Sequence, residues 1–241
     1  MIYLVQTQTG ANMKRDIIVS PLNKTQKLII STDCSGSCGE LQLDTIKVSY
    51  ELMAYYTARV PFMEVMSVRA TPVAYTISNF IKTGYDAIHL GINKVLNELN
   101  LSHLPNITST ETNFNMVQSA IGISVIGTME GKINDNASNL SFACIGSPLV
   151  GDEVIGNSNK MIKLSTFTEL VNDKKAIKLL PTGSKGIGYK LKKVFNIDAL
   201  SSDVDLNKSA GPSTCILLGY NKEDENYFRK KLKEQFHSIT I

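Results

Sequence analysis

Alternating and helical patterns of apolar residues divide the chain into a strand-rich first part and a shorter mixed second part. Residues 16–20 and 27–33 are rich in β-branched side chains and end in turn formers, which predicts two strands. The apolar residues 48–68 predict a long helix that Pro61 kinks or breaks near Val60, because proline removes a backbone donor and clashes with the preceding turn. Alternation predicts a further strand at residues 71–80.

Residues 86–99 carry the clearest helical pattern. Their apolar side chains recur at i, i+4, i+7, i+8 and i+11 and form one stripe: Ile88, Ile92, Val95, Leu96 and Leu99. We expect a polar loop at residues 106–115, an alternating strand at 119–131, a polar hairpin at 133–139 and a strand at 140–146.

Proline and glycine cluster in residues 147–157, which predicts a joint between domains. Beyond it, Thr166 and Glu169 match the capping box of a helix. The remaining pattern predicts helices to about residue 174, at 184–196 and at 223–236, and strands at 176–183, 213–220 and 237–241. The fold class is therefore α/β (α+β) with two domains, residues 1–146 and 147–241.

Charge and composition exclude several classes of partner. Lysine and arginine number 25 against 22 acidic residues, a net charge of +3, whereas nucleic-acid binding usually requires a concentrated basic face. The basic runs "KGIGYKLKKV" and "FRKKLKEQ" have helical spacing and predict solvated helix faces. No apolar run approaches the roughly 20 residues of a membrane-spanning helix, and the start lacks signal-peptide features. We expect a cytoplasmic protein without membrane or nucleic-acid partners.

The segment "STDCSGSCGE" poses a choice between a cysteine site and a ligand-holding loop. Cys34 and Cys38 are spaced C-x3-C rather than C-x-x-C, and no second ligand pair completes a zinc site. Cys144 and Cys215 lie in apolar runs and are predicted to be small core residues. A redox or metal role for the cysteines is therefore disfavoured.

Three carboxylates are candidates for a Mg²⁺ site, since Mg²⁺ typically binds one or two carboxylates together with nucleotide phosphates. Asp33 ends a predicted strand, and Glu111 lies between a helix and a strand. An Asx-turn and a solvated loop acid are the ordinary alternatives for these two. Glu64 has mostly apolar neighbours at helical spacing, so its carboxylate needs a partner.

Glycines indicate a second type of contact. The segment "GSKGIG", residues 183–188, lacks the G-K-[ST] order of a P-loop. It nevertheless places Lys185 at the start of a helix, where amide donors favour anions. "KSAGPST", residues 208–214, is a similar polar approach to a strand. Simple turn formation is the alternative for both.

The order of these motifs resembles the PurM-like ATP-binding superfamily of aminoimidazole ribonucleotide synthetase, selenophosphate synthetase, thiamine monophosphate kinase and hydrogenase-maturation dehydratases. In that superfamily a strand ends in Thr-Asp, a long helix carries Leu-Ser-Asp before Ala-Met-Gly-Ala-x-Pro, and a Gly-Gly-Asp-Thr loop enters a later strand. Here Thr32 and Asp33 match the first motif, "FMEVMSVRATP" the second and "STET" the third.

The sequence departs from the superfamily motifs at several positions, and other segments resemble one branch of the superfamily. Glu64 and Glu111 replace the two later aspartates, Arg69 replaces a glycine, an early Gly-Asp-Asp segment is missing, and the second part is short. "DCSGSCGE", "PTGSKGI" and "KSAGPST" look most like the α-ribazole kinase, or AIR synthase-related, branch.

The resemblance implies a protein that dimerises through its N-terminal mixed sheet and binds ATP and Mg²⁺. It assigns catalysis to Asp33, Glu64 and Glu111, the metal to these three and Asp44, and the nucleotide to Gly36, Gly39, Gly183, Lys185 and Gly186. The implied reaction is phosphoryl transfer to a nucleoside-like hydroxyl, with α-ribazole (cobalamin lower-ligand salvage) as the favoured acceptor. A ring-forming or dehydrating synthase and a non-enzymatic nucleotide-binding protein are the alternatives.

Overall fold

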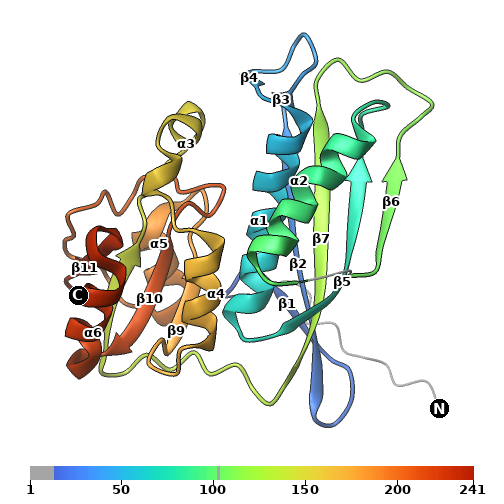
Figure 1. The fold of residues 1–241 in the computed structure, drawn as a ribbon. Helices are drawn as coiled ribbons and strands as arrows, with labels where there is room; N and C mark the ends of the chain where they lie inside the picture. The colour runs from blue at the N-terminus through green and yellow to red at the C-terminus, as the bar shows by residue number, and fades with distance from the viewer. Residues whose placement is uncertain (1–13, 102–103) are drawn as a thin grey trace.

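The structure is a computed structural model that describes residues 14–101 and 104–241, so residues 1–13 of the first predicted domain lie outside it. Two sheets organise the described residues (Figure 1). The first has the order β1-β2-β7-β5-β6 and the second the order β11-β8-β10-β9. The strands of the first sheet are β1 (Ile18–Pro21), β2 (Gln26–Gly36), β5 (Thr71–Asn79), β6 (Asn106–Thr110) and β7 (Ala120–Glu130).

The first sheet is mixed, as predicted. β2 and β7 form a long antiparallel pair, while β5 and β6 run parallel. Helices α1 (Tyr50–Ser67) and α2 (Tyr85–Glu98) cover one face (Figure 1). The predicted apolar stripe of α2 is buried in the core, which confirms the helical pattern. On the same face, alternate strand side chains such as Ile29, Ile123 and Val125 are fully buried.

Helix α1 lies between the two halves of the molecule. It packs against β2 and β7 on one side and against β9 (Lys178–Pro181) and α4 (Leu164–Asn172) on the other. Such a helix is buried all round, so its sequence lacks a polar face. The break predicted at Pro61 is wrong: the helix is continuous, because packing on both sides outweighs the loss of one backbone hydrogen bond.

The second sheet is antiparallel throughout and is covered on both faces. It consists of β8 (Leu140–Ile145), β9, β10 (Ile216–Asn221) and β11 (Phe236–Ile239). Helix α5 (Gly186–Phe195) packs against the face that carries Cys144 and Leu217, and both cysteines of this region are buried as predicted. Helices α4 and α6 (Glu225–Leu232) contribute to the core on the opposite face.

Several local predictions need correction. Helix α4 begins at Leu164 after Lys163, so Thr166 lies inside the helix and makes no capping box. Part of the predicted loop at 106–115 is strand β6, which pairs with β5. The segment 133–139 is no hairpin, because β7 and β8 belong to different sheets. Strand pairing thus changes sheets ahead of the domain boundary predicted after residue 146.

Short elements complete the described fold. A two-stranded parallel pair follows β2, and a short helix, α3, precedes α4. None of the described helices combines the length and the apolar character that crossing a bilayer requires. The bounds are β3 (Cys38–Gly39), β4 (Ile46–Lys47), α3 (Asp152–Gly156), η1 (Ser158–Lys160), η2 (Lys222–Asp224) and η3 (Lys233–Gln235).

Arginines of the first half hold backbone carbonyls of the second half. Arg59 of α1 is 1% exposed, and its Nη2 donates to the carbonyl oxygens of Ile162 at 2.6 Å and Ser213 at 3.1 Å. Arg69 and Arg15 likewise donate to carbonyl oxygens of the second half. Since main-chain acceptors cannot rotate away as side chains can, these bonds fix the two halves relative to each other.

Replacing the buried arginine should therefore loosen this interface. We expect Arg59→Leu to lower the free energy of unfolding by about 3 kcal/mol, because it leaves buried carbonyls without donors. Arg69→Leu should lower it by only about 1 kcal/mol, since Arg69 is exposed to water. Urea unfolding followed by circular dichroism measures both. Equal losses in the two variants would contradict a special role for Arg59.

Candidate functional site

A polar cavity of about 320 Å³ lies between β2, α1 and the start of α5. We call it the lysine cavity. Strand β2 contributes Asp33, helix α1 contributes Glu64, and the second half contributes Gly183, Lys185 and Gly186. These five predicted site residues come from three distant segments of the chain and line one cavity.

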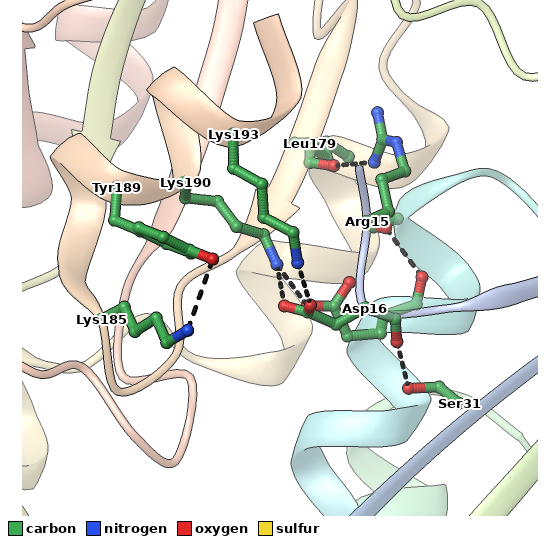
Figure 2. Close-up of polar contacts among 10 residues, drawn as sticks. Arg15, Asp16, Ser31, Leu179, Lys185, Tyr189, Lys190 and Lys193 are labelled. Carbon is green, nitrogen blue, oxygen red and sulfur yellow. Dashed lines mark hydrogen bonds and ion pairs between the residues drawn. The ribbon is translucent and has the colours of Figure 1, made fainter. Parts of the chain in front are cut away.

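A buried lysine connects the acids of this cavity. Lys190 of α5 is 3% exposed, and its Nζ lies 2.6 Å from Asp16 Oδ2 and 2.9 Å from Glu64 Oε1. Figure 2 shows Lys190 and its neighbour Lys193 converging on Asp16. Burial alone would lower the pKa of Lys190, but the carboxylates of Glu64 and Asp16 raise it above its usual value. Lys190 is therefore a permanent positive charge inside the protein.

Glu64 keeps one carboxylate oxygen free. Its Oε2 is buried and has no hydrogen-bond partner among the described residues, although Oε1 is paired with Lys190. Burial raises the pKa of Glu64, while Lys190 opposes the shift. An unpaired buried acceptor is unfavourable by about 1–3 kcal/mol. A cation or a donor that enters the cavity would satisfy it.

Asp33 of β2 lines the lysine cavity and carries a carboxyl group with a strongly shifted pKa. Burial raises the pKa of Asp33 to about 6, the negative charge of Glu64 adds to the shift, and the backbone amide of Cys34 opposes it. The carboxylate is ionised above pH 6 and adds a second negative group next to Glu64.

The start of α5 supplies the opposite polarity. Gly186 has φ +81°, and a Cβ there would approach the carbonyl oxygen of Leu206 to 2.8 Å, so glycine is required. No described side chain caps this helix, but the amide of Gly186 donates to the carbonyl oxygen of Gly183 and the amide of Gly188 to that of Leu206. The positive end of the helix dipole and the ammonium of Lys185 favour an anion here. The ammonium of Lys185 lies 4.7 Å from the ring centre of Tyr189, which holds it near the cavity.

Two predicted metal ligands lie elsewhere. Asp44 is buried, and its carboxylate accepts hydrogen bonds from the amide and hydroxyl of Ser119 and the amide of Leu41. Burial opposes the shift, but these bonds lower the pKa of Asp44. Glu111 is bonded to the amides of Asn113 and Phe114, which lower its pKa. Both carboxylates secure local loops.

The geometry of the first sheet explains the separation of the acids. Glu111 follows β6, which is three strands away from β2, so spacings of about 4.8 Å put it roughly 14 Å or more from Asp33. Within residues 14–101 and 104–241, no group of three or more histidine, cysteine, aspartate or glutamate side chains is arranged to hold a metal ion. A metal in the lysine cavity would meet the carboxylates of Asp33 and Glu64, because both oxygens of Asp16, the third acid of the lining, are paired with Lys190 and Lys193.

The two remaining glycines also lie outside the lysine cavity. Gly36 ends β2 and has open space around it. Gly39 has φ +152°, and a Cβ there would come within 2.5 Å of the hydroxyl of Ser119. Close packing against Ser119 therefore explains the glycine at position 39. No neighbouring atom requires a glycine at position 36.

Three charged residues of the cavity were missed by the sequence analysis: Asp16, Lys190 and Lys193. The run "KGIGYKLKKV" was predicted to be a solvated face, which is wrong for Lys190. A signal was present, because Lys190 lies three residues after Ile187 and four before Val194, on the buried side of the helix. Asp16 offered no comparable signal, since its partner lies 174 residues away.

A second cavity of about 290 Å³ adjoins the first, and Asp33 lines both. We call it the apolar cavity. Its walls come from the β4 region, the first turns of α1, and α3 of the second half. Cys34 and Cys38 lie along it as free thiols. The apolar lining residues are Ile46, Val48, Leu52, Met53, Val154, Ile155 and Pro212.

Comparison with known proteins identifies the fold. No protein-family model matches the sequence, and no curated protein does. The solved structure of AaThiL complexed with AMPPCP and TMP superposes with a TM-score of 0.64 and 13% identity, over 95% of this chain and 85% of that chain. A chain of the HypE–HypF complex gives a TM-score of 0.63 and 12% identity, over 93% and 86%.

Thermotoga maritima PurL complexed with AMPPCP gives a TM-score of 0.61 and 11% identity, over 92% of this chain. The chain spans 41% of PurL. This chain has the PurM-like fold. Identities this low show the fold alone, and the fold predicted from the order of the motifs is confirmed. In this chain, the lysine cavity lies between the two halves.

The shifted carboxyl group makes the stability depend on pH. The folded-state pKa of Asp33, about 6, exceeds the ordinary value of 3.8, so this carboxylate lowers the free energy of unfolding as pH rises from about 4 to about 6. We expect Asp33→Asn to stabilise the protein by about 2 kcal/mol at pH 8 and by almost nothing at pH 4, allowing for partial solvation. Denaturant unfolding at both pH values measures this. A variant less stable than the wild type at pH 8 would contradict the assignment.

Proposed function

We propose that this protein is an ATP-dependent enzyme that transfers a phosphoryl group to the hydroxyl of a nucleoside-like acceptor, with α-ribazole as the favoured acceptor. One observation carries the proposal: the lysine cavity combines three lysines near the start of a helix with the carboxylates of Asp33 and Glu64, and Glu64 Oε2 has no partner among the described residues. In support, structures with the same fold contain AMPPCP or ATP.

The polyphosphate of ATP would lie against the start of α5. Lys185 provides a donor at this end, and Lys190 and Lys193 add positive charge along the same helix. The roughly four negative charges of a nucleoside triphosphate need such neutralisation. Phosphoryl transfer depends mainly on positioning and charge stabilisation. Because Lys190 is already paired with Glu64 and Asp16, Lys185 is the lysine with the greatest freedom to contact phosphate.

The residues of the cavity fit a Mg²⁺ ion. Glu64 Oε2 is an orphaned buried acceptor, and the carboxylate of Asp33 lines the same space. Two carboxylates plus phosphate oxygens and water make a normal Mg²⁺ environment. When bound, the ion would neutralise charge on the phosphates. The metal roles predicted for Asp44 and Glu111 are not part of this proposal, since neither lines the cavity.

The proposed step is a direct transfer. The acceptor oxygen bonds to the γ-phosphorus, the bond from that phosphorus to the β,γ-bridging oxygen breaks, and ADP leaves with the bridging oxygen. The hydroxyl proton passes to water. Lys185 and the start of α5 hold the phosphates in place, and Asp33 lies where acceptor and phosphate meet, since it borders both cavities.

Nucleotide binding is the first test. We expect Mg·ATP at 100 times its Kd to raise the free energy of unfolding by about 2.7 kcal/mol. Lys185→Met and Glu64→Gln should each reduce this stabilisation strongly. Lys192→Met is the matched control, because Lys192 is on the same helix, pairs with the exposed Asp198 and does not line the cavity. No stabilisation of the wild type at millimolar Mg·ATP would refute the proposal.

Phosphorus NMR separates the reaction types. A kinase produces ADP and a new phosphomonoester only when α-ribazole or another acceptor is present. Inorganic phosphate together with a cyclised or dehydrated product would instead identify a synthase. Binding without any turnover would identify a nucleotide-binding protein.

We also propose a homodimer that forms through the first sheet. The face opposite α1 and α2 carries no described helix (Figure 1). A cross-strand row of apolar residues crosses it, because Ile18 pairs with Ile30, Ile30 with Ile126, and Ile126 with Ala74. Half of Ile18 is exposed. An uncovered apolar sheet face favours association with another protein surface. A second copy of the chain would cover this row.

A charge in the middle of that row should prevent association. We expect the wild type to sediment as a dimer and Ile126→Arg as a folded monomer in analytical ultracentrifugation. Circular dichroism checks that the variant keeps its fold. A monomeric wild type at micromolar concentration, or a dimeric Ile126→Arg variant, would exclude this interface.

A further inference from the structure

The apolar cavity has chemistry unlike that of the lysine cavity. Within the described part of the chain, Asp33 is the one charged residue among those that line it. Leu52 and Met53 of α1 face Val154 and Ile155 of α3 across the space. An anionic group has no positive partner here and meets the carboxylate of Asp33. The cavity is therefore suited to an uncharged group.

Two polar side chains that line the apolar cavity, those of Thr57 and Tyr56, are already bonded to the protein. Thr57 Oγ1 donates to the carbonyl oxygen of Met53 at 2.8 Å. The hydroxyl of Tyr56 is directed to the sulfur of Met161 at 4.0 Å. A ring with many donors and acceptors would lose its bonds to water on entry and gain few from these side chains, which is unfavourable. A ring with few such groups avoids this loss.

An ion pair outside the apolar cavity holds helix α3, which forms one of its walls. Glu153 of α3 pairs with Lys208 at 2.8 Å, which ties the short helix to the segment before Gly211 and Pro212. Ile155 lines the cavity although 46% of it is exposed, so apolar surface is available for a ligand to cover. A fixed wall with exposed apolar surface is a property of a preformed site.

We propose that the apolar cavity binds the ring of the phosphoryl acceptor, and that this ring is planar, uncharged and poor in hydrogen-bonding groups. The proposal rests on the function proposed above, in which the polyphosphate occupies the lysine cavity. Since Asp33 borders both cavities, a ring on one side brings its attached hydroxyl to the phosphate on the other. The same features disfavour a purine ring, whose edge carries several donors and acceptors.

The test compares two nucleosides on designed variants. Isothermal titration calorimetry measures the binding of α-ribazole, adenosine and AMPPCP to the full chain. The wild type should bind α-ribazole at least tenfold more tightly than adenosine. Leu52→Gln and Ile155→Asn should weaken α-ribazole at least tenfold and change the Kd of AMPPCP less than twofold. Both residues are partly exposed, so the variants should fold.

A matched control and distinct outcomes separate this inference from the proposed function. Leu90→Gln, on the exposed side of α2, should change neither affinity. If Leu52→Gln and Ile155→Asn weaken AMPPCP as much as α-ribazole, the cavity holds the adenine ring and the inference is wrong. A wild type that binds AMPPCP but not α-ribazole also overturns it, while nucleotide binding stands. A wild type that binds α-ribazole but not AMPPCP refutes the proposed function instead.

Discussion

Helix α1 is buried between two sheets, and this constraint shapes the rest of the molecule. Its charged residues Arg59 and Glu64 are almost completely removed from water, so both need partners from the other half of the chain. Arg59 finds backbone carbonyls at Ile162 and Ser213, and Glu64 finds the ammonium of Lys190. Burying a charge without such partners is very unfavourable. The relative placement of the two halves therefore follows from the polar groups of one apolar helix.

The same constraint leaves a buried polar atom of the lysine cavity without a hydrogen-bond partner among the described residues. One oxygen of Glu64 has no partner among the described residues, and Asp33 keeps its charge in a site that raises its pKa to about 6. Both features lower the stability of the folded protein. Strain of this kind is typical of functional sites, where a ligand supplies the missing interaction. A cation bound to phosphate would supply the positive charge that pairs with these carboxylates and the negative charge that pairs with the start of α5.

Asp33 gives the two cavities a common border. The cavity on one side combines lysines and carboxylates, and the cavity on the other is almost free of charge. A transfer reaction needs two ligands of different chemistry held against each other, and preorganised contact of this kind supplies much of the rate. The proposed kinase and its ring-binding cavity thus depend on one residue of β2. The arginines that join the two halves also fix the positions of the two cavities relative to each other.

The sequence by itself determined those features that depend on local spacing or on the order of motifs. The apolar stripe of α2 was evident because helix periodicity is local, and Asp33, Glu64, Gly183, Lys185 and Gly186 were singled out by their positions at element ends or within apolar surroundings. Only the tertiary structure decided which of them meet. Strand order put Glu111 three strands from Asp33, and long-range packing brought Lys190 to Glu64. Pairing between distant segments depends on the packing of whole elements, which no local pattern encodes.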